Sequence, residues 1–133
     1  MAAQVDASVV EGIVHVSIRG HAGSLTGGEA VMKALWHAHR SRSRCIVFDI
    51  REAFHPERHA QVVEHAANAV KNGMTGYRIA VVGVAGDPLL EFIDDVAANR
   101  GLRAKTFTDL DAARDWLRPA RPSRPGRSDS AAA

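Results

Sequence analysis

The chain has 133 residues, of which 46% are hydrophobic and 24% charged. A chain of this length forms one domain and buries enough surface to fold without a disulfide or a metal. Its single cysteine, Cys45, has no partner for an internal disulfide and lies in the apolar run 45–48, which is typical of a buried residue. No apolar stretch approaches the ~20 residues of a membrane span, and the N-terminus lacks a signal pattern. We therefore expect a cytoplasmic protein.

The formal net charge of +2 comes from the end of the chain. Residues 118–133 hold four arginines and one aspartate among Pro, Ser and Ala, whereas residues 1–117 have a net charge of −1. This division predicts a folded domain over 1–117 and a disordered Arg/Pro/Ala-rich tail over 118–133. The nearly neutral domain does not indicate a nucleic-acid-binding face. The tail could touch acidic lipid or nucleic acid, but a biased amino-acid composition explains it more simply.

The first part of the chain predicts a hairpin and a helix. Two strands, 5–10 and 13–19, join at a tight turn at Glu11-Gly12. In the second strand apolar residues alternate with polar ones such as His15, which indicates one buried and one solvated face. After a loop over 20–25, Thr26 and Glu29 have the spacing of a capping box, and a helix should follow to residue 39.

The middle of the chain alternates buried strands with amphipathic helices. A continuous apolar run over 44–50 predicts a strand covered on both faces. A helix should run from Pro56 to residue 72 and stop at Gly73, followed by a second buried strand over 77–84. Asp87 and Pro88 predict the N-cap and first residue of a helix ending near residue 100, before a strand over 103–107.

The last element should close the domain. Thr108 can cap a helix, and acidic residues at 109 and 111 favour the positive end of its dipole. Leu110, Ala113, Trp116 and Leu117 share one face at helical spacing. The complete order is ββαβαβαβα, which predicts an α/β fold with a mixed five-stranded sheet, about four helices and the hairpin strand at one edge.

Several stretches of this order resemble the STAS domain, and more closely the SpoIIAA-like family of small stand-alone proteins. The resemblance spans residues 5–117. It is carried by Gly20, Thr26 and Glu29 before the first helix, by strand segments 46–50 and 78–82, and by the closing pattern of Phe107, Asp109, Ala112, Trp116 and Leu117. It implies a regulatory switch or binding module rather than an enzyme. Some relatives are grouped with lipid-carrying SEC14-type domains.

The chain departs from the anti-sigma-factor antagonists at one place. Antagonists carry a phosphorylatable serine after the third strand, whereas residues 49–60 here contain no hydroxyl side chain. The resemblance therefore does not imply a switch by serine phosphorylation at that site.

A candidate binding rim follows the third and fourth strands, because ligands of open α/β sheets collect beyond the carboxyl ends of the strands. The simpler alternative is that Arg51 and Glu52 pair with each other or with solvent and that Asp49 ends its strand. The rim consists of Asp49, Arg51, Glu52, His55, His59, Gly83 and Gly86.

Histidine spacing offers a weak metal hypothesis. His55 and His59 lie four apart at a helix start, but the glutamate of a His-Glu-x-x-His motif is missing. We predict no metal, no cofactor and no catalytic residue, and keep a metal-assisted enzyme using these two histidines as the weakest alternative.

An apolar pair on the first helix, Met32 and Trp36, predicts either an exposed ridge or the lining of a cavity. The first hypothesis is a non-enzymatic STAS-like regulatory or protein-interaction module that binds a protein partner, or itself as a homodimer through the first helix or an edge strand. The second is a carrier of a small apolar ligand or lipid, with a cavity near Trp36, Phe54 and Phe92.

Overall fold

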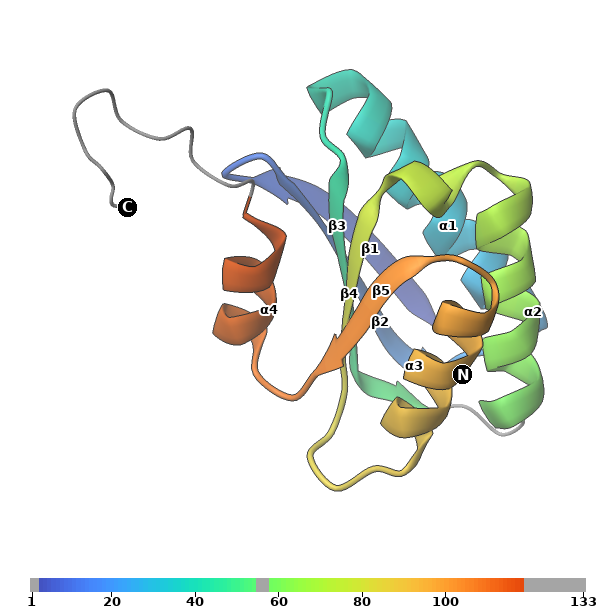
Figure 1. Ribbon diagram of the computed structural model, residues 1–133. Coiled ribbons are helices and arrows are strands. Elements are labelled where there is room, and N and C mark those ends of the chain that lie inside the picture. The colour runs from blue at the N-terminus through green and yellow to red at the C-terminus, as the bar shows by residue number, and fades with distance from the viewer. Residues whose placement is uncertain (1–2, 55–57, 119–133) are drawn as a thin grey trace.

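A computed structural model describes residues 3–54 and 58–118, in which four α-helices and a short 3-10 helix surround a five-stranded sheet (Figure 1). His55, Pro56, Glu57 and the tail from residue 119 lie outside the described residues. The elements in chain order are β1 (Gln4–Val10), β2 (Ile13–His21), α1 (Ser24–Ser41), β3 (Cys45–Phe54), α2 (Arg58–Lys71), η1 (Met74–Gly76), β4 (Arg78–Val82), α3 (Leu89–Asn99), β5 (Arg103–Phe107) and α4 (Leu110–Leu117).

The strand order is β1-β2-β3-β4-β5, with β1 antiparallel to β2 and the other three pairs parallel. The β1–β2 turn has positive φ at both central residues, 52° at Glu11 and 78° at Gly12, as the twist of a two-residue hairpin favours. The predicted fold class, element order and edge position of β1 are confirmed.

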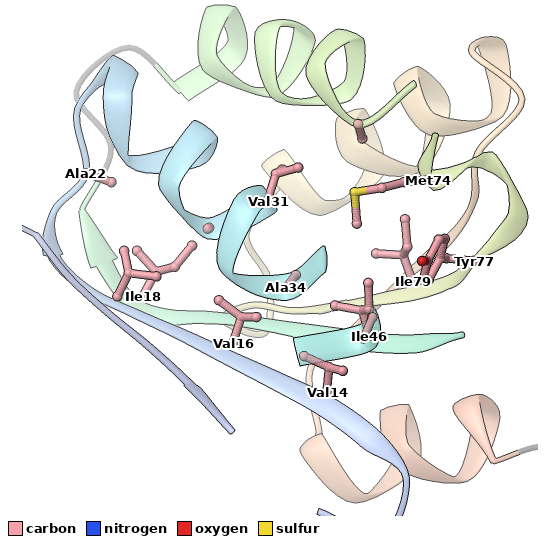
Figure 2. Close-up of a cluster of buried hydrophobic side chains, with 14 residues drawn as sticks. Val14, Val16, Ile18, Ala22, Val31, Ala34, Ile46, Met74, Tyr77 and Ile79 are labelled. Carbon is pink, nitrogen blue, oxygen red and sulfur yellow. The ribbon is translucent and has the colours of Figure 1, made fainter. Parts of the chain in front are cut away.

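Most of the core lies between the sheet and the helices α1, α2 and α3, which share one face of the sheet in Figure 1. Figure 2 shows Val14, Val16 and Ile18 of β2 and Ile46 of β3 beneath α1. Met74, from the short helix η1, is fully buried in the same cluster. The alternation that predicted a buried face for β2 is therefore confirmed.

The opposite face of the sheet is covered by α4, which lies apart from the other helices in Figure 1. Ala113 and Leu117 are fully buried there, and Leu110 and Trp116 pack at the edge of the same cluster, as predicted. The Cys45 thiol, also buried, donates to the Leu117 carbonyl at 2.9 Å. Burial raises the pKa of this thiol, so it behaves as a packed apolar group rather than a thiolate.

The sequence predicted the presence of each α-helix correctly but placed the first residues of the helices less accurately. Helix α1 begins at Ser24, and the Gly23 amide donates to Thr26 Oγ1 at 2.9 Å, so Thr26 lies inside the first turn and is not the N-cap. Glu29 instead forms an ion pair with Lys33, one turn later. The N-cap is Gly23, so the structure moves the predicted helix start back by three residues.

The predicted cap of α4 was wrong by one position. Asp109, not Thr108, is the N-cap, and its carboxylate accepts from the Ala112 amide at 3.2 Å. The predicted cap of α3 was also wrong by one position, because Pro88, not Asp87, is the N-cap and the helix begins at Leu89. The Asp87 carboxylate, one residue earlier, accepts from the Leu89 amide at 3.0 Å. Within the described part of the chain, no helix is long and apolar enough to cross a membrane.

Replacing Leu117 with alanine tests the contribution of α4. Leu117 is fully buried, so Leu117→Ala should lower the free energy of unfolding by about 2–5 kcal/mol. The matched control is Leu25→Ala in α1, where 87% of the leucine is exposed and the change should stay within about 0.5 kcal/mol. Urea unfolding followed by circular dichroism measures both, and equal effects of the two variants would contradict the packing of α4.

Two adjacent glycines in α1 give a second test. A Cβ on Gly27 would lie 1.9 Å from Nε2 of His65 on α2, whereas a Cβ on Gly28 would meet open space. Gly27→Ala should therefore destabilise the protein by about 1–3 kcal/mol, and Gly28→Ala should stabilise it by up to about 1 kcal/mol through helix propensity. Chemical unfolding of the double variant Gly27→Ala/His65→Ala isolates the cause: removal of the ring should cancel the clash, and no recovery would contradict it.

Candidate functional site

The strand β3 does not end where the predicted rim requires. It continues four residues past Ile50, to Phe54, and its pairing with β2 shifts register after Asp49, because Ser17 pairs with Asp49 while Arg19 pairs with Glu52. The extra residue forms a β-bulge. Asp49 therefore lies within the strand, two residues beyond Val47 of the α4-side cluster and on the same face of the sheet.

Asp49 holds its neighbour Arg51 at this bulge. The Asp49 carboxylate accepts from the Arg51 side chain at 2.9 and 2.7 Å and from the Arg51 backbone amide at 3.1 Å. The hydrogen bond from the Arg51 side chain, partly opposed by burial, lowers the pKa of Asp49. Arg51 thus pairs with Asp49, and not with Glu52 as the simpler alternative had it.

His15 is the polar residue that the sequence pattern placed wrongly. It was expected on a solvated face, but it is half-buried, and its Nε2 has no hydrogen-bond partner within the described residues. Burial lowers the pKa of His15, the nearby Arg114 guanidinium of α4 lowers it further, and Asp49 acts in the opposite direction. The neutral imidazole therefore predominates at physiological pH.

The remaining rim residues and their neighbours form two groups. Glu52 and Phe54 are exposed at the end of β3, where the Phe54 ring lies 4.8 Å from the ring of His21. On the helical side, the Arg58 guanidinium of α2 forms an ion pair with Asp87, next to the exposed Gly86. This ion pair joins the start of α2 to the loop before α3.

The two glycines and His59 belong to this second group. A Cβ on Gly83 would lie 2.5 Å from a terminal methyl of Leu90, which would have to shift to admit it, and Gly86 has a φ of 83°. The His59 ring packs edge-on against Phe92, with 4.6 Å between centroids. These contacts give both glycines and the histidine structural roles, and binding at the rim stays a prediction.

Residues 3–54 and 58–118 contain no group of three or more His, Cys, Asp or Glu side chains placed to hold a metal ion. His55, one member of the proposed pair, lies outside the described residues.

An open groove runs between α1 and the edge strand β1. It has a volume of about 780 Å³. Met32 and Trp36 are 58% and 57% exposed there, so they form a ridge rather than a cavity lining. The Arg40 guanidinium lies 4.8 Å from the centre of the Trp36 ring. We call this surface the α1–β1 groove; it is lined by Val5, Asp6, Ala7, Met32, Lys33, Leu35, Trp36, His37, His39 and Asn72.

A separate apolar cavity of about 140 Å³ lies between the sheet and helices α1, α2 and α3. It is not where the sequence placed it: Trp36, Phe54 and Phe92 do not line it, whereas Phe48, Met74 and Ile79 do.

Comparison with known proteins supports the fold. No protein-family model matches the chain, and no curated protein is similar to it in sequence. Two solved structures superimpose over nearly the whole domain, each with 17% sequence identity and a TM-score of 0.59. One is an uncharacterised protein of the DUF3478 family with a SpoIIAA-like fold from Shewanella loihica, aligned over 87% of this chain and 94% of its own. The other is an anti-sigma factor antagonist from Mycobacterium paratuberculosis, aligned over 89% and 96%.

This chain has the SpoIIAA-like fold. The resemblance noted from the strand segments and the closing pattern is therefore confirmed at the level of the fold. The exposed ridge was one of two predicted alternatives, and a cavity between sheet and helices was expected. The part of β1 in the groove and the residues that line the cavity were missed, because each combines elements far apart in the chain. The exposed Met32 and Trp36, on a helix that follows an edge hairpin, were the available signal for the groove.

Asp49→Asn tests the ion pair at the bulge. Because the folded pKa is depressed, the carboxylate stabilises the fold above its ordinary value of 3.8, and this contribution is lost as pH falls through the lower folded value. With both side chains partly exposed, we expect a loss of up to about 1 kcal/mol at pH 7 that shrinks below pH 3.8. Urea unfolding across pH measures it. Asp6→Asn, which breaks the more exposed pair with Arg19, is the control; a pH-independent loss for Asp49→Asn would contradict the assignment.

Proposed function

We propose that this protein is a non-enzymatic, SpoIIAA-like protein-interaction module, and that its contact surface is the α1–β1 groove. The observation that carries the proposal is the exposed Met32–Trp36 ridge beside an edge strand. Aromatic residues and methionine are enriched in the cores of protein interfaces. Consistent with this, two polar side chains of the rim, Asp49 and Arg51, form an ion pair with each other, and Arg58 and Asp87 pair beside the rim.

The edge strand β1 is open to pairing. Its sequence, Gln-Val-Asp-Ala-Ser-Val-Val, has no proline or lysine of the kind that protects edges, and Val9 and Val10 are 37% and 41% exposed. Protection comes from α1, where the Lys33 ammonium donates to the Val5 carbonyl at 2.7 Å. The remainder of the strand is available to a partner that adds a strand to the sheet.

We propose that the partner is a second copy of the chain. Two β1 strands can pair antiparallel about a two-fold axis, which makes the surface self-complementary. Helix α1 packs on β1 and β2, and strands lie ~4.8 Å apart. Two α1 helices related by that axis would then lie ~10 Å apart, within the packing distance of helices. The Met32–Trp36 ridges would meet, and the sheet would become continuous across the dimer.

The regulatory role is proposed without the serine switch of antagonists. The segment 49–60 has no hydroxyl, so control would come from association itself and not from phosphorylation there. A second candidate function, carriage of a small apolar ligand, is favoured by the 140 Å³ cavity.

Charge insertion at the ridge tests the interaction surface. Native mass spectrometry and sedimentation equilibrium should give twice the chain mass of 14.3 kDa for the parent protein and the single mass for Trp36→Glu. Trp36 is more than half exposed, so the variant should keep its fold by circular dichroism.

The matched control is Phe54→Glu, which places the same charge at an equally exposed aromatic residue outside the groove and should leave the dimer intact. A parent protein that stays monomeric at about 0.1 mM would overturn self-association. Dissociation by Phe54→Glu and not by Trp36→Glu would move the interface to the end of β3.

A further inference from the structure

The cavity lies where helix α2 stands off the sheet, and several of the residues that line it on the helices are small. Helix α2 packs chiefly on α1, α3 and η1. The helices place Gly27, Ala30, Ala66 and Ala97 along the cavity wall. Protein interiors are normally packed as densely as organic crystals, so a gap of about 140 Å³ is larger than ordinary packing leaves.

The wall is mainly apolar. Phe48 and Ile79 come from the sheet, Val96 from α3 and Met74 from η1, and Figure 2 shows Met74 and Ile79 on the side of the sheet that carries the helices. Side chains that line a void lack contact atoms on one side and lose dispersion energy. A ligand that fills the void restores those contacts.

The polar lining is confined to one end. Thr26 lies in the first turn of α1, and Arg58, Gln61 and His65 lie in the first two turns of α2. Arg58 is paired with Asp87 at the start of α3. A ligand charge would therefore meet an apolar wall over most of the cavity, at a high desolvation cost.

We propose that this cavity binds a compact, uncharged, apolar molecule of the size of a single aromatic ring. A dry apolar cavity of about 150 Å³ in another protein holds benzene or xenon, which sets the scale. The same volume excludes a long acyl chain or an intact lipid. The inference rests on the second candidate function, names its ligand class, and is independent of dimerisation.

Methionine methyl groups offer a direct test. The chain has three methionines, of which Met74 lines the cavity, Met32 lies in the α1–β1 groove and Met1 begins the chain. In protein labelled with ¹³C at the methionine methyls, titration with benzene or toluene should shift the Met74 signal through the ring current and leave the Met32 signal in place. An unmoved Met74 signal at the solubility limit of benzene would overturn the proposal. Equal shifts of Met32 and Met74 would show non-specific binding and would also overturn it.

Cavity-filling variants locate the binding. Ala66→Leu, on α2, should weaken benzene binding at least tenfold, whereas Ala60→Leu, on an exposed position of the same helix, should leave it unchanged. Val96→Phe fills the cavity from α3, and it replaces Ala66→Leu in this binding test if Ala66→Leu does not fold. Unchanged affinity in a folded filling variant would contradict the site.

The size limit and the interaction surface are tested separately. Tetradecanoate should not shift Met74, and a shift would overturn the size limit in favour of a lipid carrier. The Trp36→Glu variant should bind benzene as the parent protein does, so loss of the dimer and loss of ligand binding are distinguishable outcomes.

Discussion

The strand order β2-β3-β4-β5 is the constraint on which the rest of the structure depends. Each strand pairs with the one before it in sequence, so the sheet grows in one direction from β2 to β5. Crossovers between parallel strands are right-handed, so three successive crossovers in one direction place α1, α2 and α3 on the same face of the sheet. After β5 there is no further strand to reach, and α4 turns back to the opposite face (Figure 1). The two faces of the sheet are therefore covered unequally.

This unequal coverage explains why polar groups lie on part of the α4 face and why an apolar cavity lies on the other face. Helix α4 has eight residues and packs on β3, β4 and β5, so the part of the same face near β2 carries His15 and the Asp49–Arg51 pair instead of an apolar core. Three helices cover the other face of the sheet, and α2 packs on α1, α3 and η1 rather than on the strands. A cavity then remains between α2 and the sheet, where a conventional core would be filled.

Hydrophobic periodicity was enough to predict every strand and α-helix, because each buries one face or two against a neighbour, but it missed the short helix η1. It failed where local polar geometry decides. The continuation of β3 to Phe54 depends on Asp49 accepting the Arg51 amide at a bulge, which interrupts the alternation that marks a strand. At the start of α4, Thr108 and Asp109 are both competent caps, and only the backbone conformation of Asp109 selects between them. For the candidate site, the rule about carboxyl ends of strands placed Asp49 beside the loop of Gly83 and Gly86, and Asp49 does pair with Val82 at the end of β4. It could not foresee that β3 would continue past this point to Phe54.

Helix α1 is the common wall of the groove and the cavity, and its sequence divides between them. Gly27, Ala30 and Val31 face the cavity, while Met32 and Trp36 face the groove. Val31 and Met32 are adjacent in sequence but about 100° apart around the helix, which follows from 3.6 residues per turn. The one helix can therefore serve two binding surfaces with different residues, and a substitution at Trp36 acts on the groove without altering the lining of the cavity. Helix α1 is thus apolar on two sides, one lining the cavity and one exposed in the groove, and each of the two proposals uses one of these sides.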